Sequence, residues 1–310
     1  MEKIAYLFAG QGSQYIGMGK DLCEAFPESR RIFDQADQVL GFALSQLCFK
    51  GPLEELTKTQ NCQPAVLAMS IACLEAFKSV PSTKYQVPSY VAGLSLGEYS
   101  ALVAVGALSF ADAVYLVRRR GEFMEEEALK QPGKMVSVLG LDLETIKDIC
   151  RQTGAEIANI NSPGQIVISG DARSIEDSAR IAEEKGAKRA IFLEVSGAFH
   201  SSFMSQAASK LAKELENIKI NVPGIPVISN VTAKPTSEPT QIRENLVKQV
   251  AGSVLWQDSM SFILTGGIIN FIEFGPGKVL KGLLRRIDER AKVTNIEKKE
   301  DIAVLVGNTS

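Results

Sequence analysis

Short apolar runs alternate with longer amphipathic stretches along much of the chain, which is typical of an α/β protein. Four runs are nearly continuous in apolar residues, as expected of strands buried on both faces: residues 4–8, 89–92, 226–230 and 268–274. Helical spacing predicts helices over residues 65–77, 98–108, 112–127, 202–217 and 278–287. Further helix ends are expected at Pro27, Gly41, Gly51–Pro52 and Gln63–Pro64. The pattern predicts a large domain built on a parallel sheet.

A second pattern begins after residues 132–133, Pro-Gly. It predicts one helix capped by Asp142 and ended by Gly154, and another that begins at a Ser174 capping box and ends at Gly186. Strands are predicted over 135–141, twice within 155–170, and over 190–195. The order β-α-β-β-α-β is that of a ferredoxin-like unit. We therefore expect a small domain over 128–196, inserted into a large domain of 1–127 and 197–310. Residues after Thr294 show no pattern that predicts an element.

Composition narrows the class of protein. The 310 residues carry a net charge of −2, which disfavours a nucleic-acid binder with a basic surface. No uncharged apolar stretch reaches the roughly eighteen residues of a membrane span, and the apolar run at 4–9 is too short for a signal peptide. The five cysteines are widely spaced and form no C-x-x-C pair, so neither a metal site nor a disulfide framework is indicated. We expect a cytoplasmic protein without a metal or cofactor.

The sequence Gly-Leu-Ser-Leu-Gly at residues 93–97 fits the G-x-S-x-G nucleophile elbow, in which a serine stands on a sharp strand-to-helix turn. A β-prone run precedes it, and an alanine- and leucine-rich stretch follows. The free N–H groups at such a helix start favour negative charge that develops beside the serine. Ser95 and Glu98 also fit a capping box, so a simple helix cap is the alternative interpretation.

A second glycine-rich segment, Gly-Gln-Gly at residues 10–12, follows the first predicted strand. Tyr15 stands where a dinucleotide fingerprint requires its third glycine, and the lysine of a P-loop is missing. We interpret the segment as a tight backbone turn beside the site, with a plain loop as the alternative.

His200 is the only histidine in the chain, and therefore the only imidazole available to activate Ser95. It follows a predicted strand end, where catalytic groups gather in open α/β sheets, although a structural histidine is the alternative. An α/β-hydrolase triad also needs an acidic third member, and no single acid stands out here. A group other than a carboxylate could hold the imidazole, which weakens a lipase or esterase interpretation.

Six motifs occur in an order that resembles the malonyl-CoA:acyl-carrier-protein transacylase family of dissociated fatty-acid synthesis. They are GQGSQ at 10–14, GLSLGEYS at 93–100, RG at 120–121, NSPGQ at 161–165, GAFH at 197–200 and GPGK at 275–278. The resemblance spans about residues 4–290, and the combination of motifs is highly specific. It implies an α/β-hydrolase-like domain with an inserted ferredoxin-like domain, in agreement with the order of predicted elements.

The resemblance implies the catalytic roles of the matching residues. Ser95 would carry the malonyl group as an ester, with His200 as general base and then general acid. The main-chain carbonyl of Gln249 would orient His200, in place of a triad carboxylate. Backbone N–H groups of Gln11 and Leu96 would form the oxyanion hole.

The same resemblance implies how the acyl group is bound. Arg120, the third of three consecutive arginines, would bind the free malonyl carboxylate. Phe199 resembles the bulky residue that marks malonyl-selective members, and its ring would crowd an α-methyl group. Further expected substrate contacts are Gln63, Met124 and Asn161. One departure from the family is Leu94, where many members have a histidine before the nucleophile.

The expected partners are malonyl-CoA and an acidic, phosphopantetheinylated acyl carrier protein, and the expected enzyme is a monomer that binds neither nucleic acid nor membrane. Four basic residues are expected to assist carrier docking: Lys188, Arg189, Arg285 and Arg286. Three alternatives remain at this stage: a standalone trans-acting acyltransferase of a polyketide pathway, a serine hydrolase, and a non-catalytic acyl-chain or dinucleotide binder.

Overall fold

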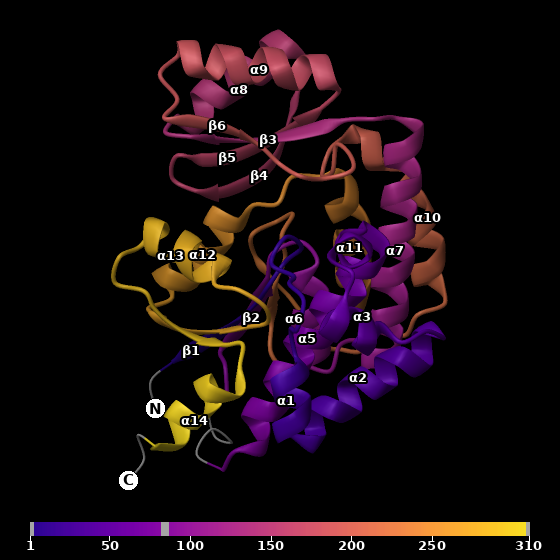
Figure 1. Cartoon of the computed structure of the whole chain (residues 1–310). Helices are drawn as coiled ribbons and strands as arrows, with labels where there is room; N and C mark the ends of the chain where they lie inside the picture. Colours follow the sequence, from indigo (N-terminus) through magenta and orange to yellow (C-terminus); the bar gives the residue numbers. More distant parts are fainter. Residues whose placement is uncertain (1–2, 82–86, 308–310) are drawn as a thin grey trace.

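Two β-sheets organise the chain in the computed structural model, which describes residues 3–81 and 87–307 (Figure 1). Among these residues the larger sheet has six strands in the order β10-β9-β1-β2-β7-β8. They are β1 (Ile4–Phe8), β2 (Tyr90–Gly93), β7 (Val227–Ile228), β8 (Pro235–Thr236), β9 (Asn270–Phe274) and β10 (Lys292–Ile296). Neighbouring strands are parallel except β7 and β8.

The prediction of a parallel sheet fails at β8, so the larger sheet is mixed. β8 returns beside β7 in a tight hairpin, in which the N–H of Ser229 donates to the carbonyl of Lys234 at 3.0 Å. Ala233 turns this corner with a φ of 52°. A parallel partner would need a crossover of a dozen or more residues, and the connection is much shorter than that.

Helices cover both faces of the larger sheet. Some of these helices pack on the sheet and others pack on those helices. The helices outside residues 134–192 are α1 (Lys20–Ala25), α2 (Pro27–Leu40), α3 (Leu44–Lys50), α4 (Leu53–Thr57), α5 (Thr59–Ser79), α6 (Gly97–Ala104), α7 (Phe110–Lys130), α10 (Ser205–Glu216), α11 (Pro239–Ala251), α12 (Trp256–Thr265), α13 (Val279–Ile287) and α14 (Lys299–Gly307), with a 3-10 turn η1 (Ser202–Met204) before α10. The helix ends predicted at Pro27, Gly41 and Gly51–Pro52 are confirmed. Within the described ranges, no helix combines the length and apolarity needed to cross a bilayer.

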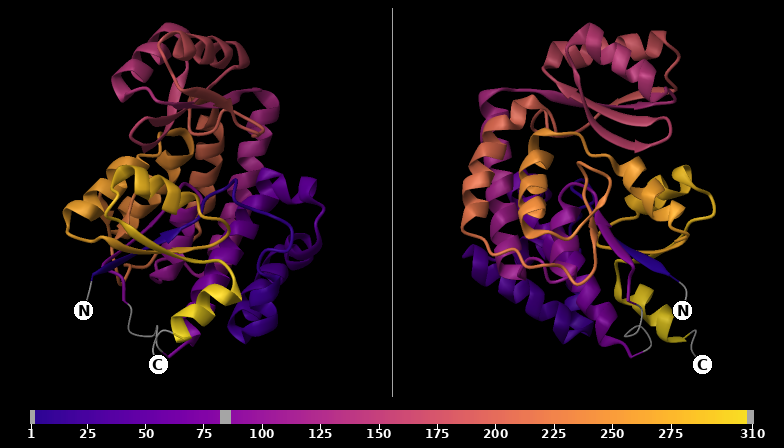
Figure 2. Two further views of the ribbon diagram at one scale, coloured as in Figure 1. Left: turned by 60° about the vertical axis from the view of Figure 1, so that its left-hand side comes forward. Right: turned by 180° about the vertical axis from the view of Figure 1, so that it is seen from behind.

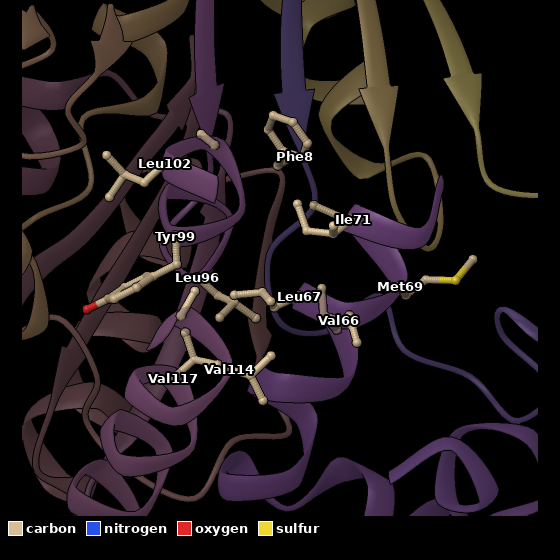
Figure 3. Close-up of a cluster of buried hydrophobic side chains, with 14 of the residues drawn as sticks. Phe8, Val66, Leu67, Met69, Ile71, Leu96, Tyr99, Leu102, Val114 and Val117 are labelled. Carbon is tan, nitrogen blue, oxygen red and sulfur yellow. The ribbon is translucent and has the colours of Figure 1, made fainter. Parts of the chain in front are cut away.

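Successive residues of β1 point to opposite faces of the sheet, as the two-residue period of a strand requires. Tyr6 and Phe8 pack in a core with α5, α6 and α7, and Figure 3 shows side chains of these helices gathered there. Ala5 and Leu7 pack in a second core with α12 and α13. Because both faces are covered, the strand is an unbroken apolar run, which is the signal that predicted it.

Helix α5 continues through Pro64, so the helix end predicted at Gln63–Pro64 is wrong. Proline lacks the N–H that would bind the carbonyl of Gln60, four residues earlier. The guanidinium of Arg118 donates to that carbonyl instead, at 3.2 Å. A contact from α7 thus replaces the hydrogen bond that proline removes, which local sequence could not reveal.

The last strand and helix lie where the sequence predicted nothing. β10 pairs with β9 at the edge of the larger sheet, and α14 follows it. In β10 only Asn295 and Ile296 are buried. A short edge strand of this kind shows little of the apolar periodicity on which a prediction depends.

The smaller sheet is antiparallel and stands apart from the larger one (Figures 1 and 2). Its strands, in the order β4-β5-β3-β6, are β3 (Lys134–Leu139), β4 (Glu156–Ser162), β5 (Gln165–Gly170) and β6 (Arg189–Phe192). Helices α8 (Leu143–Thr153) and α9 (Ala172–Glu184) cover its outer face. Met135 and Val167 point to the other face and join the core of the larger sheet.

The helix caps of this region agree with the sequence at one helix and not at the other. The Asp142 side chain accepts from the N–H of Thr145, and Gly154 ends α8 with a φ of 80°, as predicted. Ser174 does not cap α9. Asp171 does, because its carboxylate accepts from the N–H groups of Arg173 and Ser174, and the helix therefore begins earlier.

Candidate active site

Ser95 stands on a tight turn between β2 and α6, with a φ of 52° in the left-handed region. The flanking glycines are required sterically. A Cβ on Gly93 would lie 1.9 Å from the carbonyl carbon of Gly97, and a Cβ on Gly97 would lie 2.2 Å from the Phe8 carbonyl oxygen. The capping-box alternative does not hold, because α6 begins without a side-chain cap. The geometry is that of the predicted elbow.

His200 and Gln249 complete a hydrogen-bonded row with the serine. Oγ of Ser95 lies 2.8 Å from Nε2 of His200, and Nδ1 of His200 lies 2.8 Å from the main-chain oxygen of Gln249. A carbonyl can only accept, so Nδ1 carries the proton and Nε2 accepts from the Ser95 hydroxyl. This tautomer is the one a general base needs, and a carbonyl rather than a carboxylate selects it.

The surroundings keep the imidazole neutral. His200 is buried, and burial together with the nearby positive charge of Arg120 lowers its pKa to about 4, from 6.5. At neutral pH the ring can therefore accept a proton from Ser95.

Arg120 is the one member of the arginine run that points into the site. Its Nη1 donates to Oε1 of Gln63 at 2.8 Å, and its Nη2 lies 3.1 Å from both Oε1 of Gln249 and Oγ of Ser95. Only 1% of this residue is exposed. Its Cζ lies 5.8 Å from the centroid of the Tyr99 ring, so the guanidinium is enclosed on that side as well.

The two other arginines of the run point elsewhere, since consecutive helix residues are about 100° apart around the axis. Arg118 pairs with Glu122, and Arg119 pairs with Glu122 and Glu214.

The turn at residues 10–12 lies against the elbow, because a Cβ on Gly10 would approach the Leu94 carbonyl oxygen to 2.6 Å. Within the described part of the chain, the main-chain N–H groups of Gln11 and Leu96 donate to no protein acceptor. Leu96 directly follows the nucleophile, as the second oxyanion donor of an elbow does. Two unused donors beside Ser95 could hold a developing oxyanion.

Comparisons with known proteins identify the family. The acyl transferase domain family matches residues 5–305. The malonyl CoA-acyl carrier protein transacylase of Bacillus subtilis is 49% identical, over 99% of this chain and 97% of its own length. The solved acyl carrier protein S-malonyltransferase of Vibrio cholerae has a TM-score of 0.94 at 37% identity, over 98% of this chain and 100% of that one. The chain belongs to the malonyl-CoA:acyl-carrier-protein transacylase family.

This membership confirms the resemblance drawn from the six sequence motifs. A further solved structure holds a malonyl-transacylase in complex with its type II polyketide acyl carrier protein. It matches with a TM-score of 0.94 at 39% identity, over 99% of this chain and 100% of that one.

The remaining predicted substrate contacts come from different parts of the chain: Gln63 from α5, Met124 from α7, Phe199 from the segment before η1 and Asn161 from β4. Gln63 and Met124 are buried together, with Nε2 of Gln63 donating to the Met124 sulfur at 3.5 Å. Phe199 is buried beside His200. Asn161 lies on β4 of the smaller sheet, where its side-chain oxygen is buried without a partner among the described residues. No hydrogen bond among the described residues joins Asn161 to Ser95.

Leu94, the departure from the family pattern, is partly buried and packs against the core that contains Trp256. The position before the nucleophile therefore contributes packing here and no hydrogen-bonding side chain.

Sequence reasoning missed the residues that hold the elbow. Oδ1 of Asn230 accepts from the N–H of Ser95 at 2.6 Å, and Nδ2 of Asn230 donates to the Gly93 carbonyl at 2.8 Å. The N–H of Asn230 in turn donates to Glu98 at 3.2 Å. The position of Asn230 in the chain could have indicated this role. It follows β7 and therefore lies at the same end of the sheet as Ser95, where the parallel strands β2 and β7 end.

Proposed function

We propose that this protein transfers the malonyl group of malonyl-CoA to the phosphopantetheine thiol of acyl carrier protein through an ester on Ser95, and so supplies the elongation unit of fatty-acid synthesis. The observation that carries the proposal is the shared hydrogen bonding at Oγ of Ser95, which contacts both the base His200 and the buried cation Arg120. A nucleophile, its base and a counter-charge for an acidic acyl group therefore meet at one atom.

In the first half-reaction, Oγ of Ser95 attacks the thioester carbonyl carbon while Nε2 of His200 takes its proton. The N–H groups of Gln11 and Leu96 stabilise the resulting oxyanion. The carbon–sulfur bond then breaks, and the CoA sulfur takes the proton from Nε2 of His200 and leaves as the free thiol, which returns the imidazole to its neutral form. The second half-reaction reverses these roles: the carrier thiol gives its proton to His200, attacks the Ser95 ester, and releases the serine hydroxyl.

Arg120 selects the acyl group by charge. A carboxylate that leaves water needs a fixed counter-charge, and a guanidinium offers paired N–H donors for its two oxygens. Gln63 accepts from Nη1 of Arg120 and so holds one side of the guanidinium. Met124, Phe199 and Asn161 complete the acyl pocket in this proposal.

We propose an α/β-hydrolase-like catalytic domain, residues 1–127 and 197–310, with an inserted ferredoxin-like domain, residues 128–196. The chain order β3-α8-β4-β5-α9-β6 and the sheet order β4-β5-β3-β6 support the inserted unit. The elbow at the end of β2 supports the hydrolase-like part. Main-chain bonds between Val254 and β4 join the two parts, at 2.8 and 2.9 Å.

The carrier docks, in this proposal, on a basic pocket between the two parts. Three of the four predicted docking residues, Lys188, Arg189 and Arg286, line a pocket of about 600 Å³ with Gly140 and Gly164. An acidic carrier would find complementary charge there. The solved complex of a 39% identical malonyl-transacylase with its acyl carrier protein supports a carrier as partner.

We place the protein in the cytoplasm as a monomer. Its five cysteines are buried and unpaired, which suits a reducing compartment. Light scattering of the purified chain tests the monomer, and a mass near 33.5 kDa is expected.

Intact-protein mass spectrometry after mixing with malonyl-CoA tests the ester. One malonyl adduct is expected on the wild type and none on Ser95→Ala. An unmodified wild type, or equal labelling of the variant, would contradict the mechanism. With a cognate carrier present, hydrolysis that outruns transfer would favour a serine hydrolase instead.

A second candidate role is the charging of carriers in polyketide synthesis, as a standalone trans-acting acyltransferase. The similarity to the malonyl-transacylase solved with a type II polyketide carrier favours it. The ratio of transfer rates to a fatty-acid carrier and a polyketide carrier separates the two roles. Preference for the polyketide carrier would overturn the first.

A further inference from the structure

The carboxylate of Glu98 is buried directly behind the elbow, yet the chemistry above does not use it. This residue is the second of α6 and only 2% exposed. Its Oε2 accepts from the main-chain N–H of Asn230 at 3.2 Å and from Nε2 of Gln249 at 2.6 Å. A buried carboxylate is costly unless it is paired and hydrogen-bonded, and here the two N–H donors and the nearby Arg120 charge act against that cost.

The Gln249 side chain connects this carboxylate to the guanidinium. Its Nε2 donates to Glu98, and also to the main-chain oxygen of Ser95 at 3.0 Å. Its Oε1 accepts from Nη2 of Arg120 at 3.1 Å. An amide has one donating and one accepting end, so an anion on one side and a cation on the other determine which way it points.

We propose that Glu98 is a positioning residue and the resident counter-charge of Arg120. Its carboxylate orients the Gln249 amide, which holds Arg120 at the nucleophile, and it balances the guanidinium while no acyl carboxylate is bound. The inference rests on the proposed function, in which Arg120 binds that carboxylate.

The arrangement has opposite effects on binding and on chemistry. A bound malonyl carboxylate shares Arg120 with Glu98, so Glu98 weakens malonyl binding in the ground state. In the transition state His200 gains a positive charge beside Arg120, and the Glu98 anion offsets that repulsion. Loss of the Glu98 charge should therefore tighten malonyl binding and slow acylation. A disrupted site would instead weaken malonyl binding and slow acylation.

Burial and the surrounding polar groups act in opposite directions on the Glu98 carboxyl. Burial raises the pKa of Glu98 to about 7, although the Asn230 N–H, the Gln249 amide, the Arg120 charge and the Ser229 hydroxyl act to lower it. The titratable groups that face Glu98 are Arg120 from α7 and Tyr99 from α6. Among the described residues, the segment after β7 and helix α11 present the neutral Ser229, Asn230 and Gln249 to Glu98.

Single-turnover acylation of Ser95 in the full chain tests the proposal with Glu98→Gln, which keeps an oxygen acceptor but removes the charge. For malonyl-CoA we expect the half-saturating concentration to fall and the maximal rate to fall, each on the order of tenfold. For acetyl-CoA, which has no carboxylate, the half-saturating concentration should stay unchanged.

Glu127→Gln is the matched control. Glu127 is also 2% exposed, but it pairs with Lys130 and Lys210 at the far end of α7. Its replacement should leave the malonyl-to-acetyl ratio of half-saturating concentrations as in the wild type.

A higher half-saturating concentration for malonyl-CoA in Glu98→Gln, with acetyl-CoA affected equally, would overturn the proposal. Arg120→Ala separates this failure from failure of the proposed function, because it asks directly whether Arg120 discriminates the two acyl groups. If Glu98→Gln does not fold, the pH profile of the wild type tests the proposal instead. The maximal malonylation rate should rise through about pH 7 as Glu98 ionises. A rate that does not change with pH in this range would overturn the proposed role of Glu98.

Discussion

Nη2 of Arg120 and Oγ of Ser95 lie 3.1 Å apart, so a buried cation contacts the nucleophile itself. The guanidinium comes from the middle of α7, and the serine comes from the turn before α6. In the proposed function this contact places the counter-charge for the malonyl carboxylate at the nucleophile, so acyl selectivity and the pH dependence of acylation both test it.

Replacing Arg120 by Ala should remove malonyl transfer selectively. An acyl carboxylate buried without its partner carries a penalty of roughly 3–5 kcal/mol, or about two to three and a half decades in rate. Acetyl transfer should hold steady or rise. Transfer rates from the two CoA esters measure this, with Arg119→Ala as control because that side chain pairs with Glu214 outside the site. Equal loss of both activities would show that Arg120 is structural.

The pH profile of acylation should show a base that titrates unusually low. Burial and Arg120 lower the pKa of His200 to about 4, and in the proposed mechanism the neutral ring is the active form. In Glu98→Gln, which lacks the other nearby ionisation, the maximal rate should stay flat from about pH 8 to about pH 5. Single-turnover rates over this range measure it. A fall centred near the ordinary histidine pKa of about 6.5 would contradict the expectation.

Glu98→Gln should also gain stability at alkaline pH. The folded pKa of Glu98 is raised to about 7 from 4.5, so wild-type stability is lost as pH rises from the unfolded value through the folded one. The difference in unfolding free energy between variant and wild type should grow by roughly 3 kcal/mol between about pH 4.5 and pH 8. Urea titrations at both pH values measure this. If the difference in unfolding free energy were the same at both pH values, ionisation of Glu98 would not destabilise the folded protein.

Carrier transfer should depend on charge at the pocket of Lys188, Arg189 and Arg286. Exchanging Lys188 and Arg189 for Glu should raise the half-saturating carrier concentration about tenfold or more, while acylation of Ser95 by malonyl-CoA changes little. Added salt should slow transfer by the wild type more than by the variant. Steady-state transfer to the carrier at two ionic strengths measures both effects, and an unchanged carrier dependence would place docking elsewhere.

Phe199→Ser should relax the choice of acyl group. Phe199 is buried and directly precedes His200, and in the proposed acyl pocket its ring would crowd an α-methyl group. The ratio of malonyl to methylmalonyl transfer should fall about tenfold or more, through gain of the methylmalonyl rate. Competition between the two CoA esters measures the ratio. A parallel loss of both rates would indicate a packing role only.

Local sequence determined those parts of this protein that short-range sterics and periodicity control. The glycines around Ser95 predicted the elbow, because only glycine fits at those positions. The apolar run of β1 predicted a strand covered on both faces. Asp142 and Gly154 marked the two ends of α8 through their own backbone preferences. These signals act within a few residues, so the strands of the smaller sheet and β1, β2, β7 and β9 of the larger one could be predicted, whereas β8 and β10 could not.

Only the tertiary structure decided which distant groups meet. Pro64 stays within α5 because Arg118 satisfies the carbonyl that proline leaves free. Of the arginine run, Arg120 alone reaches Ser95, since the rotation of α7 is fixed by packing. Asn230 lies 135 residues from Ser95 along the chain and yet holds its N–H. Such contacts depend on how buried polar groups are satisfied across the whole fold, and no local pattern encodes that.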